Sequence, residues 1–344
     1  MAYTTINDPS AYFQTLLYTG GSSSYTNDGN SDLQPDWVWI KARNNAYEHK
    51  LWDSSRGTTK LLVSNSTAAE ATQSGLTAFN SDGFSLGGDG GSNDASTNFV
   101  AWQWKGNGGT TTSNSDGSIT STVQANTTAG FSIVTWTGTG SNGTVGHGLG
   151  KAPDCIFFKN YTAAENWVTY HSVLGNSGGL YLNLDNSFNT ASSWYSDTSP
   201  TSDYFYVGTN TKTNGGTMVA YCFADTKGYS KFGSYTGNGN ADGTFVYTGF
   251  KPAYIMVKRT DSTGGWNIQD LKRSPFNVQD NFIQADDADP EAVVGTGGLW
   301  DSLSNGFKLR QNLTTTNASG GTFIYMAFAQ NPLVATNDVI ALAR

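Results

Sequence analysis

Three short segments decide how this chain folds: "PDWVWIK" (residues 35–41), "PDCIFFK" (residues 153–159) and "PAYIMVK" (residues 252–258). Each begins with proline, continues through an apolar run and ends with lysine six residues later. Eight residues past each lysine stand His49, Trp167 and Trp266, and four residues further on come Asp53, His171 and Asp270. Constant offsets of this kind predict three copies of one structural unit.

Other blocks repeat around these segments in the same order. Each copy opens with "YFQTLLYTG" (12–20), "FSIVTWTG" (131–138) or "FGSYTG" (232–237), and closes with "FVAWQWK" (99–105), "MVAYCFA" (218–224) or "FIYMAFA" (323–329). We therefore predict units at residues 1–107, 130–228 and 229–332. Residues 108–129, rich in Ser, Thr and Gly, are expected to form an extended linker, and residues 333–344 a C-terminal tail.

The repeated blocks also predict which residues share a face, because side chains alternate along a strand. In the closing blocks one face is large and apolar in every copy, as with Val100, Trp102 and Trp104, and the other is small or mixed. In the proline-led blocks both faces are apolar, which is typical of a central strand in a two-layer sandwich. The fold class expected is all-β: three tandem antiparallel β-sandwich units, jelly-roll or lectin-like, with little helix.

Composition and charge exclude several classes of partner. The formal net charge is −8, and Lys and Arg form no cluster. Nucleic acid and anionic membranes are therefore poor partners, since phosphate binding needs a basic face. The first ten residues do not resemble a secretory signal, and no apolar run approaches 18 residues, so membrane insertion is not expected.

One stretch, "YHSVLGNSGG" (residues 170–179), suggests catalysis, because it sets Ser177 between Gly175 and Gly179 with His171 upstream. A nucleophile elbow needs a strand-to-helix turn in an α/β sheet, which this sequence does not predict. Ser177 is therefore interpreted as a loop serine. Glycoside cleavage would need a second carboxylate near Asp53 or Asp270, and none is identified. No catalytic residue is predicted.

Neither a metal site nor a cofactor is predicted. Acidic loops at residues 27–32, 87–94 and 286–291 offer oxygen ligands, but none matches the twelve-residue calcium loop, and calcium binding is left open. Cys155 and Cys222 are expected to be small buried thiols, with one bridge between them as the alternative.

Five tryptophans near predicted loops are candidates for glycan binding: Trp52, Trp167, Trp194, Trp266 and Trp300. An exposed indole can stack on the face of a sugar ring while neighbouring amides and carboxylates bind its hydroxyls. The alternative is that these rings pack inside a sandwich or at a subunit interface, where Trp is also enriched.

Several blocks together resemble a known family. They are "MAYTTINDPSAYFQTLLYTG" (1–20), "DLQPDWVWIKAR" (32–43), "VGHGLGKAPDCIFFK" (145–159), "CFADTKGYSKFGSYTGNGNADGTFVYTGFKPAYIMVKRT" (222–260) and "NASGGTFIYMAFAQNP" (317–332). They are similar to repeat-containing, tail-fibre-like virion-surface proteins of tailed phages of marine bacteria and cyanobacteria. The resemblance implies a place on the virion surface after assembly in the host cytoplasm, and it carries over no catalytic residue.

Three functions remain open at this point. The first is non-enzymatic host recognition and adsorption through surface glycans, the second is capsid decoration that stabilises the head, and the third is a polysaccharide depolymerase. The expected partners are other virion proteins, host surface polysaccharide and further copies of the chain. A trimer is favoured because linked weak contacts add avidity. The third unit, with its acidic loop at residues 286–289, is expected to be the exposed end.

Overall fold

Three large antiparallel sheets form the framework of the computed structural model, which describes residues 4–295 and 297–334. The first sheet runs in the spatial order β1 (Phe13–Thr19), β9 (Asn98–Trp104), β3 (Trp37–Ala42), β4 (Lys50–Asp53), β5 (Lys60–Val63) and β6 (Ala71–Thr72). The third repeats that order with β20 (Ser230–Thr236), β28 (Thr322–Pro332), β22 (Phe250–Arg259), β23 (Asn267–Asp270), β24 (Asn281–Gln284) and β25 (Ala292–Val293).

The second large sheet has the same order with two additional strands at one edge. It contains β10 (Thr112–Asn114), β11 (Ser121–Asn126), β12 (Phe131–Thr137), β19 (Thr217–Phe223), β14 (Cys155–Asn160), β15 (Val168–His171), β16 (Gly175–Tyr181) and β17 (Asn189–Thr190). The additional strands, β10 and β11, lie within residues 108–129. The segment expected to be an extended linker is thus partly sheet, because every residue of β11 pairs with β12.

Smaller sheets and single helical turns complete the structure. The small sheets are β2 (Ser24–Tyr25), β8 (Phe84–Leu86) and β7 (Leu76–Phe79); β13 (Gly143–Gly146) and β18 (Tyr204–Val207); and β21 (Phe245–Tyr247), β27 (Gly306–Leu309) and β26 (Trp300–Leu303). The helical turns are η1 (Pro9–Ala11), α1 (Gly90–Asn93), η2 (Ser172–Leu174), α2 (Ser192–Tyr195), α3 (Thr211–Asn214) and α4 (Thr314–Asn317). None of the described helices has the length and apolar character needed to cross a bilayer. The predicted all-β class is confirmed.

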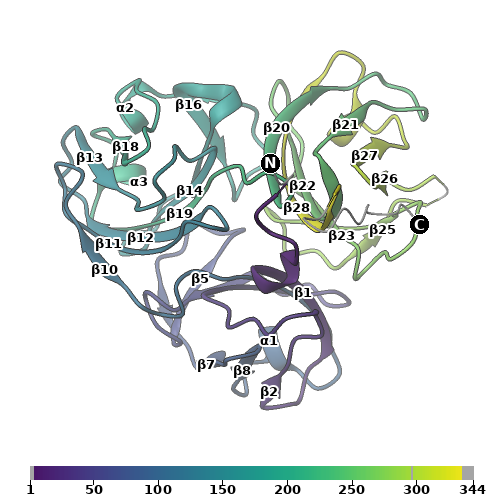
Figure 1. The fold of residues 1–344 in the computed structure, drawn as a ribbon, viewed down its shortest axis with the longest axis horizontal. Helices are drawn as coiled ribbons and strands as arrows, with labels where there is room; N and C mark the ends of the chain where they lie inside the picture. The colour runs from purple at the N-terminus through teal and green to yellow at the C-terminus, as the bar shows by residue number, and fades with distance from the viewer. Residues whose placement is uncertain (1–3, 296, 335–344) are drawn as a thin grey trace.

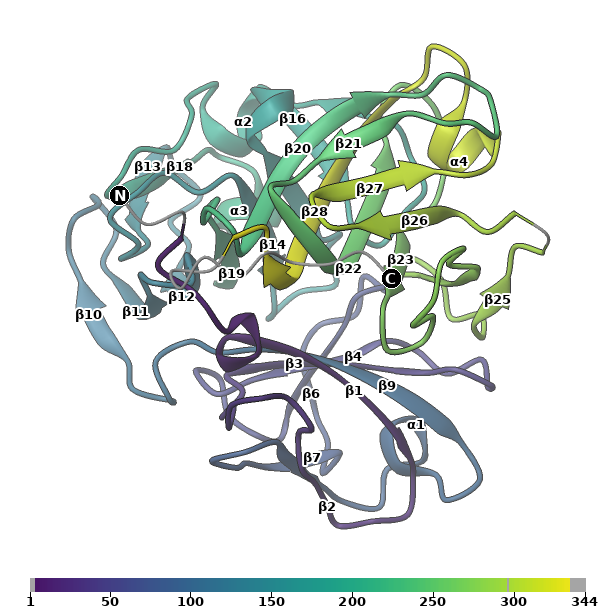
Figure 2. The same ribbon diagram turned by 45° about the vertical axis from the view of Figure 1, so that its right-hand side comes forward.

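The sheets are grouped into three lobes around a common centre (Figures 1 and 2). We call residues 4–107 lobe 1, residues 108–228 lobe 2 and residues 229–334 lobe 3. Each lobe combines one large sheet with one small sheet in a β-sandwich-like arrangement. The last lobe meets the first, so the three lobes close into a ring.

Side-chain alternation along the strands divides their residues between two kinds of core. In lobe 1, Val38 and Ile40 of β3 belong to a core within the lobe, whereas Trp37 and Trp39 belong to a core shared by all three lobes. Lobes 2 and 3 divide their strands in the same way. The large apolar faces of the closing strands β9, β19 and β28 all meet in the shared core.

Aromatic rings from different lobes are in direct contact in the shared core. Trp37 stacks on Tyr221 with a centroid distance of 4.3 Å, and Phe13 stacks on Phe328 at 5.0 Å. A buried aromatic side chain removes roughly 150–250 Å² from water, which stabilises the fold by a few kcal/mol per ring. The lobes therefore depend on one another for much of their buried apolar surface.

Candidate functional site: the seams between the lobes

Three seams join the lobes, and the polar positions that repeat in the sequence all lie there. We call the contact of lobes 1 and 2 the first seam, that of lobes 2 and 3 the second seam, and that of lobes 3 and 1 the third seam. At each seam the repeated aromatic, lysine and Asp/His positions make contacts that cross between lobes.

The repeated aromatic position, which is His49, Trp167 or Trp266, contributes a ring nitrogen to each seam. The three bonds are Trp167 Nε1 to Val63 O (2.8 Å), Trp266 Nε1 to Tyr181 O (2.8 Å) and His49 Nε2 to Gln284 O (2.9 Å). Nδ1 of His49 accepts a hydrogen bond from Trp39 Nε1, so the proton of the neutral ring lies on Nε2, which donates. Histidine thus replaces tryptophan in lobe 1 while keeping the ring N–H donor.

The repeated lysines are buried and donate to backbone carbonyls of the neighbouring lobe. These bonds are Lys41 Nζ to Ala288 O (3.0 Å), Lys159 Nζ to Thr67 O (2.9 Å) and Lys258 Nζ to Asn186 O (2.7 Å). Burial lowers the pKa of each lysine to about 8. An ammonium group surrounded by carbonyl oxygens joins two loops without needing a carboxylate in contact, as a point charge with three donors can.

The Asp/His position forms a buried ion pair at two seams. Asp53 Oδ2 accepts from Arg56 Nε at 2.6 Å and from the Tyr221 hydroxyl of lobe 2, also at 2.6 Å. Asp270 Oδ2 accepts from Arg273 Nε at 2.6 Å and from Trp102 Nε1 of lobe 1 at 3.0 Å. Both carboxylates are fully buried, and each arginine also binds a second carboxylate, Glu70 or Glu291.

The same position is neutral at the second seam. Nδ1 of His171 accepts from the Val173 backbone N–H, so Nε2 is the donor and faces Tyr325 O of lobe 3 at 3.3 Å. The residue three positions on is Leu174, where the other lobes have arginine. Burial lowers the pKa of His171 to about 4. The imidazole therefore crosses the seam uncharged.

These contacts account for the acidic and serine residues that suggested hydrolysis. Asp53 and Asp270 have no exposed side-chain surface and are neutralised by arginine, so a glycan cannot reach them. Ser177 lies at an exposed position of strand β16 rather than in a loop. The His171 ring is buried and bonded at both nitrogens elsewhere, which leaves it no role as a base for that serine.

The five tryptophans expected to be exposed are buried, which corrects the predicted glycan site. Trp167 and Trp266 are covered by the neighbouring lobe at the first and second seams, with exposed fractions of 0% and 3%. The other three, Trp52, Trp194 and Trp300, fill the cores of lobes 1, 2 and 3. A stacking platform needs an open ring face, and none of these rings offers one.

The acidic loop of lobe 3 is also part of a seam rather than an exposed end. Ala288 O binds Lys41 of lobe 1, and the Glu291 carboxylate pairs with Arg43 of lobe 1 at 2.8 Å. Lobe 3 thus contacts both other lobes. The acidic loop expected at the exposed end therefore lies against lobe 1.

Other candidate ligands have structural partners. The carboxylate of Asp89, in the glycine-rich stretch at residues 87–94, accepts from Lys50 Nζ (2.5 Å) and Gln73 Nε2 (2.8 Å). Within the described ranges, no group of three or more His, Cys, Asp or Glu side chains is placed to hold a metal ion. Cys155 and Cys222 are both free and buried, and they belong to different cores.

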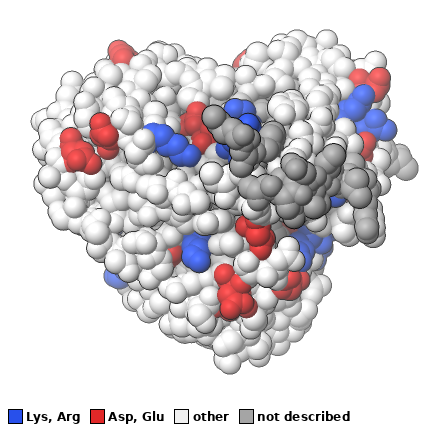
Figure 3. All heavy atoms as spheres, viewed as in Figure 1, with Lys and Arg blue, Asp and Glu red and all other residues white. Residues whose placement is uncertain are grey.

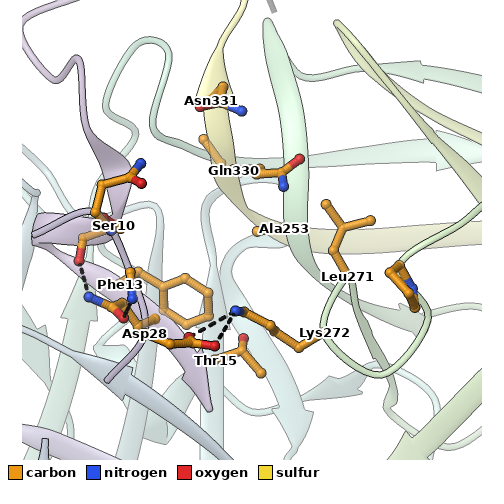
Figure 4. A pocket seen from close by; sticks show the side chains of 14 residues that line it. Ser10, Phe13, Thr15, Asp28, Ala253, Leu271, Lys272, Gln330 and Asn331 are labelled. Carbon is orange, nitrogen blue, oxygen red and sulfur yellow. Dashed lines mark hydrogen bonds and ion pairs between the residues drawn. The ribbon is translucent and has the colours of Figure 1, made fainter. Parts of the chain in front are cut away.

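Two accessible features were not predicted from the sequence. The first is a set of exposed aromatic side chains: Tyr247 and Phe245 on β21 are 56% and 44% exposed, and Phe276 is 74% exposed. The alternation in "TFVYTG" (244–249) could have indicated the outward face of β21. The second is a pocket of about 390 Å³ at the third seam, between β1 and the segment that follows β23 (Figure 4).

Comparison with known proteins gives a family without an assigned activity. No curated protein matches the chain. One family model, described as a domain of unknown function (DUF7483), matches residues 8–332 and so spans all three lobes. The chain belongs to the DUF7483 family.

Proposed function

We propose that this chain is a non-enzymatic structural protein exposed on the surface of a tailed-phage particle, where it contributes to host adsorption by contacting surface glycans. The observation that carries the proposal is the burial of the repeated lysine, aromatic and Asp/His positions at the seams. Polar groups that join a protein's own lobes build a rigid scaffold, and the outer surface is left for contact with partners. The repeated blocks resemble those of virion-surface proteins, which supports a place for this scaffold on a virion.

The accessible aromatics of the small sheets are the proposed contact points. Phe245 and Tyr247 alternate with a buried valine on β21, so both rings face outward. Tyr204 and Tyr206 on β18 are half-buried neighbours whose ring centroids are 5.6 Å apart. Partly open rings on a flat sheet can stack on sugar faces, which is the role first assigned to the buried tryptophans.

The distribution of charge supports an uncharged or weakly charged ligand. On the face shown in Figure 3, acidic and basic groups form small scattered clusters separated by wide areas without charge. Such a surface attracts polyanions weakly. Sugar hydroxyls and neutral protein surfaces suit it better.

Architecture and assembly belong to the same proposal. We regard each lobe as a lectin-like sandwich unit, fused into one chain, that acts on the virion beside other virion proteins and further copies of itself. Attachment through several weak contacts per particle gives strong overall binding by avidity.

Capsid decoration is the second candidate, and one observation favours it. Phe276 and Val278, on the loop after β23, are 74% and 38% exposed. Exposed apolar side chains on one loop can contribute to a protein contact. A decoration protein would use such a surface to grip the shell.

Two measurements test the proposal. Gold-labelled antibodies against the chain should mark intact particles of the phage that encodes it, on the tail for adsorption or on the head for decoration. Particles without label would contradict both roles.

The second measurement concerns the glycan contact. The double variant Phe245→Ser/Tyr247→Ser should lower retention of the purified chain on immobilised host polysaccharide by on the order of tenfold, the equivalent of about 1.4 kcal/mol. Val293→Ser, which changes a side chain that is 63% exposed on β25, is the matched control and should bind as the unaltered chain does. Equal retention of all three proteins would remove β21 from the proposed site.

A further inference from the structure

The pocket at the third seam lies between the edge strand of lobe 1 and the segment that follows β23 in lobe 3. Phe13, Gln14 and Thr15 of β1 line one side, and Ala253, Leu271 and Lys272 line the other. Lys272 Nζ lies 2.8 Å from both carboxylate oxygens of Asp28, so this ion pair connects the two lobes at the pocket (Figure 4). The described part of the sheet ends at β1, whose outer edge faces the pocket.

The equivalent place at the first seam is filled by strand β11. Residues 124–126 of β11 pair with residues 131–133 of β12, the counterparts in lobe 2 of Phe13, Gln14 and Thr15. Gln124 Nε2 donates to the hydroxyls of Ser54 and Ser55, each at 2.9 Å, and its Oε1 accepts from backbone N–H groups of the segment after β9. One strand with one inserted side chain thus completes the first seam.

The Asp36 carboxylate also bonds to Ser54, the residue to which Gln124 donates. Asp36 accepts from the Ser54 hydroxyl at 2.7 Å and from the backbone N–H of Gly106 at 2.7 Å. At the second seam Asp154 repeats both contacts, with the Ser172 hydroxyl at 3.1 Å and the Asp225 backbone N–H at 2.8 Å.

At the second seam the edge strand is β20, and a side chain rather than an added strand bonds to its outer edge in the described structure. The Asp225 carboxylate accepts the backbone N–H of Phe232 on β20 at 2.7 Å. Phe232 is the counterpart in lobe 3 of Thr15, as the pairing of β20 with β28 shows. The edge N–H that faces the pocket at the third seam is therefore bonded to a side chain at the second seam.

The third seam has lost the polar groups that fill the other two. Ala253 stands where Asp36 and Asp154 stand, and Leu271 stands where Ser54 and Ser172 stand. The backbone is unchanged, because Leu271 N donates to Ala253 O as Ser54 N does to Asp36 O, both at 2.9 Å. Two polar residues have thus been replaced by two apolar ones on an otherwise equivalent backbone.

A polar group that lines the pocket lacks a partner in the described structure. Thr15 is 6% exposed, and its Oγ1 makes no hydrogen bond within the described residues. A buried hydroxyl without a partner is unfavourable, so a ligand that bonds to it stabilises the complex. The pocket therefore offers an open strand edge, an unbonded hydroxyl and an apolar wall.

We propose that the third seam is a docking site for an extended segment of another protein, which adds as a strand to β1 and inserts one apolar side chain between Ala253 and Leu271. The model for this occupant is β11 at the first seam, which binds the equivalent edge and inserts Gln124. Strand addition supplies affinity through backbone hydrogen bonds and specificity through the pocket for one side chain. An apolar side chain is preferred because Asp36 and Ser54 have been replaced. This inference does not depend on the proposed phage function.

The experiment uses two labelled nonapeptides based on residues 119–127, one with the natural sequence and one with Gln124→Leu. Fluorescence polarisation with the full chain should show saturable binding of the Leu peptide, at least tenfold tighter than the Gln peptide. The variant Ala253→Asp/Leu271→Ser, which restores the residue pair of the other two seams, should reverse that preference. No saturable binding of either peptide, or a preference that the variant leaves unchanged, would overturn the proposal.

Hydrogen exchange on the unaltered chain provides a test that does not rely on the variant folding. The Leu peptide should slow exchange of the Thr15 amide and leave that of Phe232 unchanged, since Phe232 is already bonded to Asp225. Equal effects on both amides would overturn the proposal. So would a dimer of the chain that the peptide dissociates, because the occupant would then be a second copy.

Discussion

The first and second seams solve the same packing problem with different electrostatics. At the first seam the repeated position is Asp53, paired with Arg56 and bonded to Tyr221 of the next lobe. At the second seam the repeated position is His171, which bonds to the backbone carbonyl of Tyr325. Leu174 stands there where the other lobes have arginine. Both arrangements leave a buried ring or carboxylate fully bonded. The buried carboxylate is stabilised by a buried arginine, whereas the neutral ring needs only an acceptor.

The third seam again has a buried ion pair at this position, between Asp270 and Arg273. Two of the three seams thus depend on a buried ion pair, and one does not. Removing one member of a pair should be costly, while the neutral seam should respond chiefly to pH. All three seams, however, share one core, which sets the order of the effects expected below.

Removal of a lobe should have the largest effect, because it opens two seams at once. A chain ending at residue 228 loses lobe 3 and exposes the aromatic side chains of lobes 1 and 2 that face the centre. We expect no cooperative thermal unfolding transition and no native-like near-ultraviolet circular dichroism. A cooperative transition together with native-like circular dichroism in the truncated chain would show that lobes 1 and 2 fold independently of the ring.

Breaking an ionic seam should have the next largest effect. Arg273→Leu leaves the buried carboxylate of Asp270 without its cation, and should lower the free energy of unfolding by about 3–5 kcal/mol. Arg259→Leu removes an arginine from a more exposed pair with Asp261 and should cost less than about 1 kcal/mol. Chemical denaturation of both variants provides the measurement. Similar losses of unfolding free energy in the two variants would show that the buried pair contributes no more to stability than the exposed pair.

The neutral seam should weaken in acid. The pKa of His171 is about 4 in the folded chain, below the value of about 6.5 for an unfolded histidine. Between these values the unfolded chain binds more protons, so stability falls as the pH is lowered from about 6.5 to 4, by on the order of 3 kcal/mol from this residue.

The variant His171→Gln isolates that contribution, because His49 and His147, whose pKa values burial also lowers, are unchanged in it. The difference in unfolding free energy between the unaltered chain and the variant should therefore become smaller as the pH falls. A difference that is constant from pH 7 to pH 4 would contradict a neutral, buried His171.

Much of the fold could be predicted from the sequence, because it depends on local periodicity. The two faces of β9 and of the proline-led strands were assigned correctly, since a period of two residues is read directly from the order of apolar side chains. The candidate site was predicted less well. Trp167 and Trp266 follow turns and polar residues, which suggested exposure, but the neighbouring lobe covers both rings.

The sequence by itself determined the all-β class and the residues that share the faces of the repeated strands. It did so because side-chain alternation is a short-range property that consecutive residues reveal. Closure of the ring was decided only by the tertiary structure. The bonds of Asp53 to Tyr221 and of Trp102 to Asp270 each join residues 168 positions apart. A bond of that span depends on how whole lobes pack, which no local pattern encodes. The pocket at the third seam follows from the same closure, since its two walls come from opposite ends of the chain.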